Sequence, residues 1–191
     1  MSALLVGICG WGESGKNAAG EHLQAEYRIN TIGFADPIEA MLVELGIMDA
    51  AYLSSGMKNA AIPELGNRTA RHFKQSLGDW IRHEFGQDAL IRIVNDVWTD
   101  LAKAGEVLVV RDVRTDEEVD FVRGNAGVMW WLQRPGAEAA NDHHTESFDR
   151  LFRTRRMSHD VVIHNNGDIR NLHSQLDNAL VVCQRRRVVP A

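Results

Sequence analysis

Residues 4–17 read LLVGICGWGESGKN, and this stretch decides the fold. Its first six residues are apolar or small, which predicts a buried strand over residues 3–9. A glycine-rich turn follows, and Lys16 opens a predicted helix over residues 15–27. A strand, a glycine-rich turn and a helix N-terminus together wrap backbone N–H groups around a phosphate chain. The stretch therefore predicts a phosphate-binding loop.

The loop matches the pattern G-x-x-x-x-G-K-[ST] except at its last position. Asn17 stands there in place of the hydroxyl residue that normally touches Mg²⁺. Its side-chain carbonyl could face a metal-bound water, so Asn17 is also a candidate metal contact. An ordinary strand-to-helix turn with a solvated lysine is the alternative. The residues expected to contact the phosphate donor are Gly10, Gly12, Glu13, Ser14, Gly15, Lys16, Asn17 and Ala18.

Composition sets the class of protein. A chain of 191 residues with 45% hydrophobic residues is long enough for one well-buried domain, which we expect to span residues 1–191. The net charge of −5 argues against nucleic acid or an anionic membrane surface as a partner. Two cysteines without disulfide or zinc-site spacing, and no long apolar segment, favour a reducing, cytoplasmic setting. The oligomeric state stays open, with a homodimer as one option.

Predicted strands alternate with predicted helices along the whole chain. This alternation predicts an α/β fold, a three-layer sandwich with a central parallel sheet of about five strands. Ligands of such sheets bind beyond the carboxyl ends of the strands. Besides the two elements above, the expected strands are 31–35, 106–110, 127–133 and 160–164, and the expected helices are 37–45, 69–85, 88–104, 116–123 and 168–185.

Three further expectations concern these elements. The helix over 69–85 has an apolar stripe of Phe73, Leu77, Trp80 and Ile81. Residues 48–66 should be mostly loop. The adjacent Trp130 and Trp131 should point to opposite faces of the sheet, one into the core and the other under a helix or at an interface.

Polar residues follow several of these strands. Asp112 follows strand 106–110 in the manner of a Walker-B aspartate, which would hold Mg²⁺ or its water shell; alternatively it only caps the next helix. Arg114 could pair two phosphate oxygens through its planar guanidinium, or form a surface ion pair with a neighbouring acid. Asp36 and Asn165 follow two further strands, and Asp36 is expected to cap the helix whose first residue is Pro37.

Four arginines gather between residues 150 and 156 with no acid among them. This position suits a mobile lid that excludes water and neutralises a transferring phosphoryl group, with Arg150 and Arg153 as the catalytic candidates. A solvated charged face is the alternative. Upstream, His143, His144 and Glu146 could suggest a metal site, but substrate contact or a solvated loop fits them better.

The motifs taken together resemble the bacteriophage deoxynucleoside monophosphate kinases, a branch of the P-loop nucleotide kinases. The order and spacing of the blocks are more specific than the phosphate-binding loop alone. The blocks are residues 14–16, 34–38, Arg71 with Gln75 and 77–79, 112–114, 133–136, Asn141-Asp142 with 144–146, 160–163 and 165–167.

The resemblance implies phosphoryl transfer from ATP, with Mg²⁺, to a deoxynucleoside monophosphate, so that small-molecule nucleotides are the partners. It implies that Lys16 bridges the β- and γ-phosphates, that Arg71 lies near the acceptor and that Gln75 helps to read the base. It further implies an acceptor-binding region at about 37–104, a lid at about 136–159 and a donor contact at Asn165. The residues that it assigns to the acceptor are Asp36, Arg71, Gln75, Arg134, His144 and Glu146.

Two other functions remain open at this point. One is a small-molecule P-loop kinase of the dephospho-coenzyme A kinase type, which shares the loop, the aspartate after the second strand and a lid. The other is a nucleotide-binding regulatory protein with weak catalysis, in which Asn17 and Ala18 mark the loss. Either would preserve the predicted fold.

Overall fold

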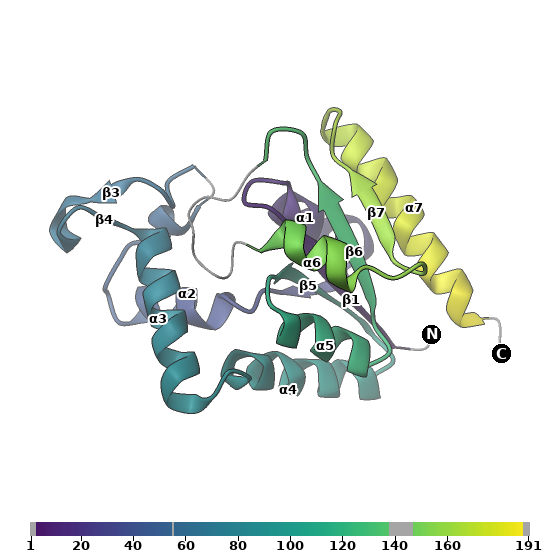
Figure 1. Ribbon diagram of the computed structural model, residues 1–191, viewed down its shortest axis with the longest axis horizontal. Coiled ribbons are helices and arrows are strands. Elements are labelled where there is room, and N and C mark those ends of the chain that lie inside the picture. The colour runs from purple at the N-terminus through teal and green to yellow at the C-terminus, as the bar shows by residue number, and fades with distance from the viewer. Residues whose placement is uncertain (1–2, 55, 138–146, 189–191) are drawn as a thin grey trace. The chain divides into compact units, whose positions relative to one another are not determined.

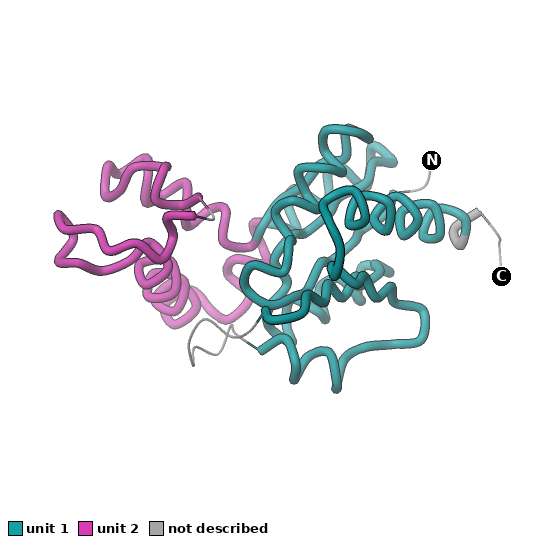
Figure 2. The backbone as a smooth tube through the Cα atoms, turned by 90° about the horizontal axis from the view of Figure 1, so that it is seen from above, with its two compact units in different colours: residues 1–33, 94–191 teal, residues 34–93 magenta. Residues whose placement is uncertain are grey.

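The computed structural model describes residues 3–54, 56–137 and 147–188. The chain divides into two compact units, which Figure 2 shows in different colours. The first contains residues 1–33 and 94–191, and the second contains residues 34–93. The second unit overlaps the predicted acceptor-binding region at 37–104.

A five-stranded parallel sheet forms the centre of the first unit (Figure 1). The strand order is β2-β5-β1-β6-β7, so the first strand of the chain lies in the middle. Helices cover both faces of the sheet, which confirms the predicted three-layer α/β sandwich. The strands are β1 (Leu4–Gly10), β2 (Asn30–Ile32), β5 (Val107–Val113), β6 (Val128–Gln133) and β7 (Val161–His164). The helices are α1 (Lys16–Tyr27), α5 (Asp116–Gly124), α6 (Phe148–Arg155) and α7 (Ile169–Val188), while α4 (Ala89–Lys103) runs from the second unit into the first.

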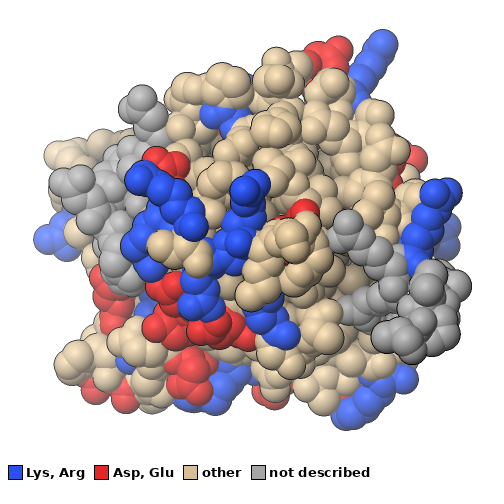
Figure 3. All heavy atoms as spheres, turned by 45° about the vertical axis from the view of Figure 1, so that its right-hand side comes forward, with Lys and Arg blue, Asp and Glu red and all other residues tan. Residues whose placement is uncertain are grey.

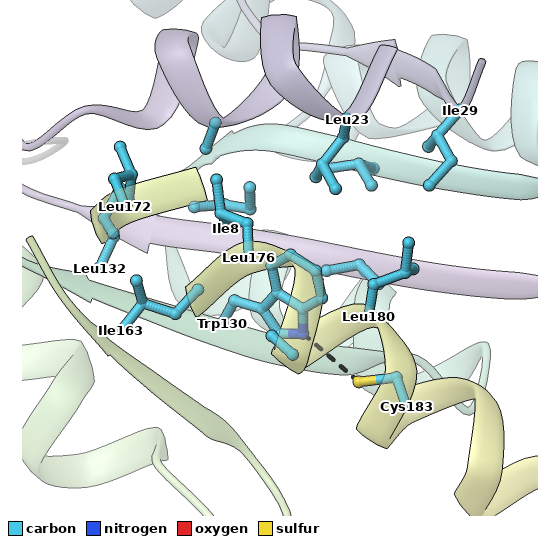
Figure 4. Close-up of a cluster of buried hydrophobic side chains, with 14 of the residues drawn as sticks. Ile8, Leu23, Ile29, Trp130, Leu132, Ile163, Leu172, Leu176, Leu180 and Cys183 are labelled. Carbon is cyan, nitrogen blue, oxygen red and sulfur yellow. Dashed lines mark hydrogen bonds between the residues drawn. The ribbon is translucent and has the colours of Figure 1, made fainter. Parts of the chain in front are cut away.

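One face of the sheet packs against α1 and α7 (Figure 4). Ile8 of β1, Leu23 of α1 and Leu176 of α7 are fully buried in this layer. Trp130 of β6 lies among them, and its indole N–H donates to Cys183 Sγ at 3.5 Å. Because successive residues of a strand point to opposite faces, the adjacent Trp131 lies on the other side of the sheet. There it contacts Phe148 and Phe152 of α6.

Strand β5 is longer and less regular than its sequence indicates. It runs to Val113, so Asp112 lies within the strand and not after it. The register between β1 and β5 shifts by one residue, because Gly7 pairs with Val110 but Cys9 pairs with Val113, so β5 has one extra residue there. Such a bulge re-aims side chains at the end of a strand. The start of α5 is capped by Thr115 and Glu118 in a reciprocal capping box, so the interpretation of Asp112 as the helix cap is wrong.

The second unit is built around two helices, α2 (Asp36–Glu44) and α3 (Ala70–Phe85). Ile38, Leu42 and Ile81 belong to its buried cluster. Residues 48–66, predicted to be mostly loop, also contain half of a small antiparallel hairpin. The further elements are two 3-10 turns, η1 (Ala50–Leu53) and η2 (Pro63–Leu65), and the strands β3 (Ala61–Ile62) and β4 (Arg68–Thr69).

Two local predictions in this unit are wrong. Ala35 is the N-cap of α2, and Asp36 is instead the first residue of the helix, followed by Pro37. Trp80 was assigned to the apolar stripe of α3, but 51% of its surface is exposed. In the part of the chain that the structure describes, no helix combines the length and apolarity that a bilayer crossing requires.

Candidate phosphate-binding site

The glycine-rich loop holds the ammonium group of Lys16 against its own backbone. Lys16 Nζ donates to the carbonyl oxygens of Gly10 and Trp11, each at 2.6 Å. The side chain is only 7% exposed although it carries a charge. Two carbonyl acceptors offset part of the cost of burying that charge and fix the position of the ammonium group. The loop therefore presents a fixed cation together with the N-terminus of α1, a combination that attracts anions.

The top of the loop adopts left-handed backbone at two positions. Glu13 has φ of 63° and Gly15 has φ of 105°. Each carbonyl between them is held from outside the loop. Arg134 Nη1 donates to Glu13 O at 3.1 Å, and Asn165 Nδ2 donates to Ser14 O at 2.9 Å. The structure thus places Arg134 and Asn165, which follow β6 and β7, against the loop backbone.

The other loop residues have different surroundings. Ser14 is 1% exposed, and its Oγ has no hydrogen-bond partner among the described residues. A Cβ on Gly10 would lie 2.6 Å from that Oγ, so the close packing of the loop requires glycine there. Asn17 is exposed in the first turn of α1, whereas Ala18 packs against the core beneath the loop.

A second cation lies near the end of β1. Burial raises the pKa of the Cys9 thiol to about 12, while the charges of Lys16 and Arg114 act in the opposite direction. Both cations are therefore close enough to this strand end to affect a buried group. The backbone of Arg114 is fixed on both sides: its N–H donates to Glu118 Oε2 at 2.6 Å, and its carbonyl accepts from Ser147 Oγ at 2.7 Å.

The predicted lid arginines lie on α6 and are paired with acids. Arg150 Nη1 is 2.6 Å from Asp116 Oδ2, and Arg153 Nη2 is 3.9 Å from Asp149 Oδ2. Arg155 pairs with both Asp116 and Asp120. On the face drawn in Figure 3, basic side chains likewise lie directly beside acidic ones. Arg150 and Arg155 thus pair with acids of α5, which the alternative of a solvated charged face did not predict.

Between the loop and α6 lies a pocket of about 410 Å³. Its wall combines the Trp11 ring with hydroxyl groups and charged groups. The lining residues are Trp11, Ser147, Asp149, Arg150, Arg153 and Thr154. Trp11 also contacts Phe148, with ring centroids 5.8 Å apart, so the start of α6 packs on the loop. Sequence reasoning did not assign a role to Trp11.

Three of the predicted acceptor residues, Asp36, Arg71 and Gln75, lie in the second unit. Arg71 Nε donates to Asn59 Oδ1 at 2.9 Å, and Arg71 N donates to Lys58 O at 3.0 Å. Gln75 lies one turn further along α3 and is half-buried, and Asp36 is half-buried at the start of α2. His144 and Glu146, with the neighbouring His143, lie outside the described residues.

Asp112 is half-buried within β5. Among the described residues, no group of three or more His, Cys, Asp or Glu side chains could hold a metal ion by itself. A metal at this edge would therefore need ligands from a bound phosphate or from water in addition to the protein.

Sequence reasoning missed a buried ion pair beneath α6. Arg123, in the last turn of α5, donates through two guanidinium nitrogens to the two carboxylate oxygens of Asp160, each at 2.6 Å. The indole N–H of Trp131 and the backbone N–H of Met157 donate to the same carboxylate at 2.8 Å and 2.9 Å. The two residues are 37 positions apart, so no local pattern could have indicated the pair.

Comparisons with known proteins add the family. The model of the deoxynucleotide monophosphate kinase family matches residues 49–176, which include Arg71, Asp112, Arg114 and Asn165 but not the glycine-rich loop. A protein of Acanthamoeba polyphaga mimivirus, whose name gives it provisionally as a deoxynucleotide monophosphate kinase, is 24% identical over 192 residues. That similarity covers 92% of this chain and 97% of the viral protein, so it includes most of the sequence.

Among solved structures, one superposes on nearly the whole chain with a TM-score above 0.5. TT1252 from Thermus thermophilus superposes with a TM-score of 0.52 at 15% identity, covering 95% of this chain and 98% of that one. A shikimate kinase from Acinetobacter baumannii gives a TM-score of 0.46 at 14% identity, covering 94% and 93% of the two chains. The family model matches well over half of the sequence. The chain belongs to the deoxynucleotide monophosphate kinase family.

Proposed function

We propose that this protein transfers the γ-phosphoryl group of ATP to the phosphate of a deoxynucleoside monophosphate, releasing ADP and the deoxynucleoside diphosphate. The observation that carries the proposal is the Lys16 ammonium, held by two carbonyls inside a glycine-rich loop, in a chain of this family. A loop of this type binds the phosphates of a nucleoside triphosphate. Membership of this family supports a deoxynucleoside monophosphate as the acceptor.

The reaction itself asks for little covalent chemistry from the protein. A phosphate oxygen of the acceptor is already a competent nucleophile, so the protein has to align two anions, screen their repulsion and exclude water. We assign the screening to Lys16 and Arg114, whose charges both act at the end of β1. Arg150 and Arg153, which line the pocket beside the loop, would stabilise the charge of the transferring group.

We assign acceptor binding to Arg71, Gln75 and Asp36 of the second unit. The hydrogen bond from Nε to Asn59 limits the rotation of the Arg71 guanidinium and so fixes the direction of its terminal nitrogens. A planar guanidinium in a fixed orientation suits bidentate pairing with a phosphate. Arg134 was assigned to the acceptor from the sequence, but its contact with Glu13 O supports a role at the donor loop instead.

The oxygen donors of this edge fit a Mg²⁺ ion that arrives with the nucleotide. Mg²⁺ prefers oxygen ligands, keeps several waters and usually takes only one or two carboxylates together with substrate phosphates. The half-buried Asp112 carboxylate supplies the one protein charge, and the exposed Asn17 amide supplies a neutral oxygen at the first turn of α1. When bound, the ion would neutralise charge on the phosphate oxygens.

The test is a panel of acceptors with ATP and Mg²⁺, followed by chromatography of the products. The four deoxynucleoside monophosphates are compared with dephospho-coenzyme A and shikimate, and Lys16→Met is the control for contaminating kinases. We expect a deoxynucleoside diphosphate and ADP in equal amounts, and no product with the control. Product only from dephospho-coenzyme A or shikimate would reject the nucleotide assignment. Tight ATP binding in calorimetry without any product would support the regulatory alternative.

A further inference from the structure

The side chain of Asn165 approaches the phosphate-binding loop from the other end of the sequence. It lies at the turn between β7 and α7, 151 residues after Ser14, and its Nδ2 donates to Ser14 O at 2.9 Å. A Cβ on Gly15 would lie 2.7 Å from the same Nδ2. Glycine at position 15 therefore serves both the positive φ of 105° and the approach of this amide.

The hydrogen bond to Ser14 O has a consequence for the next peptide N–H. In a planar trans peptide the C=O of one residue and the N–H of the next point in opposite directions. A donor that fixes the Ser14 carbonyl therefore also fixes the direction of the Gly15 N–H. That N–H belongs to the set of backbone donors that a glycine-rich loop offers to phosphate.

The turn that bears Asn165 is itself held in place. Its backbone N–H donates to Gln133 O at the end of β6, at 2.7 Å. The preceding residue, His164, is held at both backbone groups by the Gln175 side chain of α7, with bonds of 2.9 Å and 2.8 Å. A side chain on such a support loses little further freedom when it bonds to the loop. Asn165 thus contacts the glycine-rich loop from a turn that is itself held by hydrogen bonds to β6 and α7.

We propose that Asn165 is a positioning residue of the donor site, which aims the Gly15 N–H at the phosphate chain by holding the Ser14 carbonyl. The proposal rests on the proposed function only in that the loop binds a phosphate chain. It differs from the expectation that Asn165 contacts the nucleotide itself. The two roles can be distinguished, because the affinity for a phosphate chain without a base depends on the loop but not on a contact to the base.

The experiment measures binding of inorganic tripolyphosphate, and separately of ATP, by titration calorimetry. Asn165→Leu removes the donor at similar volume without adding charge, and Asn165→Ala is a smaller second variant. The matched control is Asn166→Leu, on the exposed neighbouring residue. We expect both Asn165 variants to bind tripolyphosphate and ATP about 3- to 10-fold more weakly, the effect of one neutral hydrogen bond. The control should bind like wild type, and every variant should remain folded at the temperature of the titration.

Two results would overturn the proposal. Wild-type affinity for tripolyphosphate in both variants, with weaker binding of ATP alone, would mean that Asn165 contacts the base. An equal loss in Asn166→Leu, or a loss in proportion to a lowered unfolding midpoint, would mean that the turn matters only for stability. Neither readout involves an acceptor, so a failure of the proposed phosphoryl transfer would be seen separately, in the product panel.

Discussion

The buried pair of Arg123 and Asp160 gives the sharpest prediction for stability. The Asp160 side chain is fully buried and that of Arg123 is 13% exposed. Asp160→Asn removes the negative charge at almost constant volume and leaves the guanidinium without its counter-ion. Breaking a buried ion pair from one side costs about 3–5 kcal/mol. Because Arg123 also contacts His159 Nε2 at 3.1 Å and Arg155 O at 3.4 Å, we expect a loss near the lower end, about 3 kcal/mol.

The same pair predicts a pH dependence with a definite sign. Burial by itself would raise the pKa of Asp160, but the hydrogen bonds from Arg123, Met157 and Trp131 outweigh it and hold the pKa below its usual range. An unfolded aspartate titrates near a pKa of about 3.9. The stabilising contribution is therefore complete above that pH and is lost as the pH falls through the lower pKa of the folded state.

The assay is urea unfolding of wild type and Asp160→Asn between pH 7 and pH 3. The difference in the free energy of unfolding should be largest at pH 7 and should shrink below about pH 4. Asp149→Asn makes the same chemical change in an exposed pair on α6, where the side chain is 58% exposed, and should cost at most about 0.5 kcal/mol. A cost of this small size for Asp160→Asn, or a difference that does not depend on pH, would refute the reasoning.

Three further predictions concern the loop and its helix. A Cβ on Gly20 of α1 would overlap the Arg111 side chain, so Gly20→Ala should lower the free energy of unfolding by about 1–3 kcal/mol. A Cβ on Gly124 meets open space, so Gly124→Ala should be neutral or stabilising. Equal effects of the two changes in chemical denaturation would contradict this reasoning. Lys16→Met should lower kcat of the proposed phosphoryl transfer by about 10²- to 10³-fold. A smaller loss of kcat in steady-state kinetics would mean that the Lys16 ammonium does not stabilise the transition state. Asn17→Thr should lower the Mg²⁺ concentration for half-maximal rate and Asn17→Leu should raise it, and indifference to both changes in a Mg²⁺ titration would exclude a metal contact.

The sequence predicts most of the sheet because its signals are local. Strand β1, the glycine-rich turn and α1 follow one another within residues 4–27, and their apolar pattern and glycines carry the information. The adjacent Trp130 and Trp131 similarly predict two covered faces, because strand residues alternate. Both are fully buried, one against α7 and one against α6. Periodicity, in contrast, placed Trp80 in the apolar stripe of α3, although half of its surface is exposed. The spacing of apolar residues does not show how much of a helix face is covered by neighbouring elements.

The site needed information that no local pattern contains. Whether Asp112 ends a strand or caps a helix depends on the shifted register between β1 and β5, and a bulge has no signature in this sequence. The resemblance implied that Arg134 contacts the acceptor and that Asn165 contacts the donor. Their contacts with Glu13 and Ser14 join segments more than a hundred residues apart in the chain. Long-range contacts of this kind follow from strand order, which the alternation of elements leaves undetermined.

The pairing of Arg150 with Asp116 is compatible with the proposed role of Arg150 in phosphoryl transfer. The two side chains are 53% and 35% exposed, so water screens their attraction and the pair is worth at most about 1 kcal/mol. A multiply charged phosphate chain in the neighbouring pocket would offer Arg150 a stronger, bidentate partner at that small cost. Asp116 also contacts Arg155, so it retains a cation when Arg150 leaves. Asp116 therefore restrains Arg150 too weakly to prevent the proposed contact with a nucleotide.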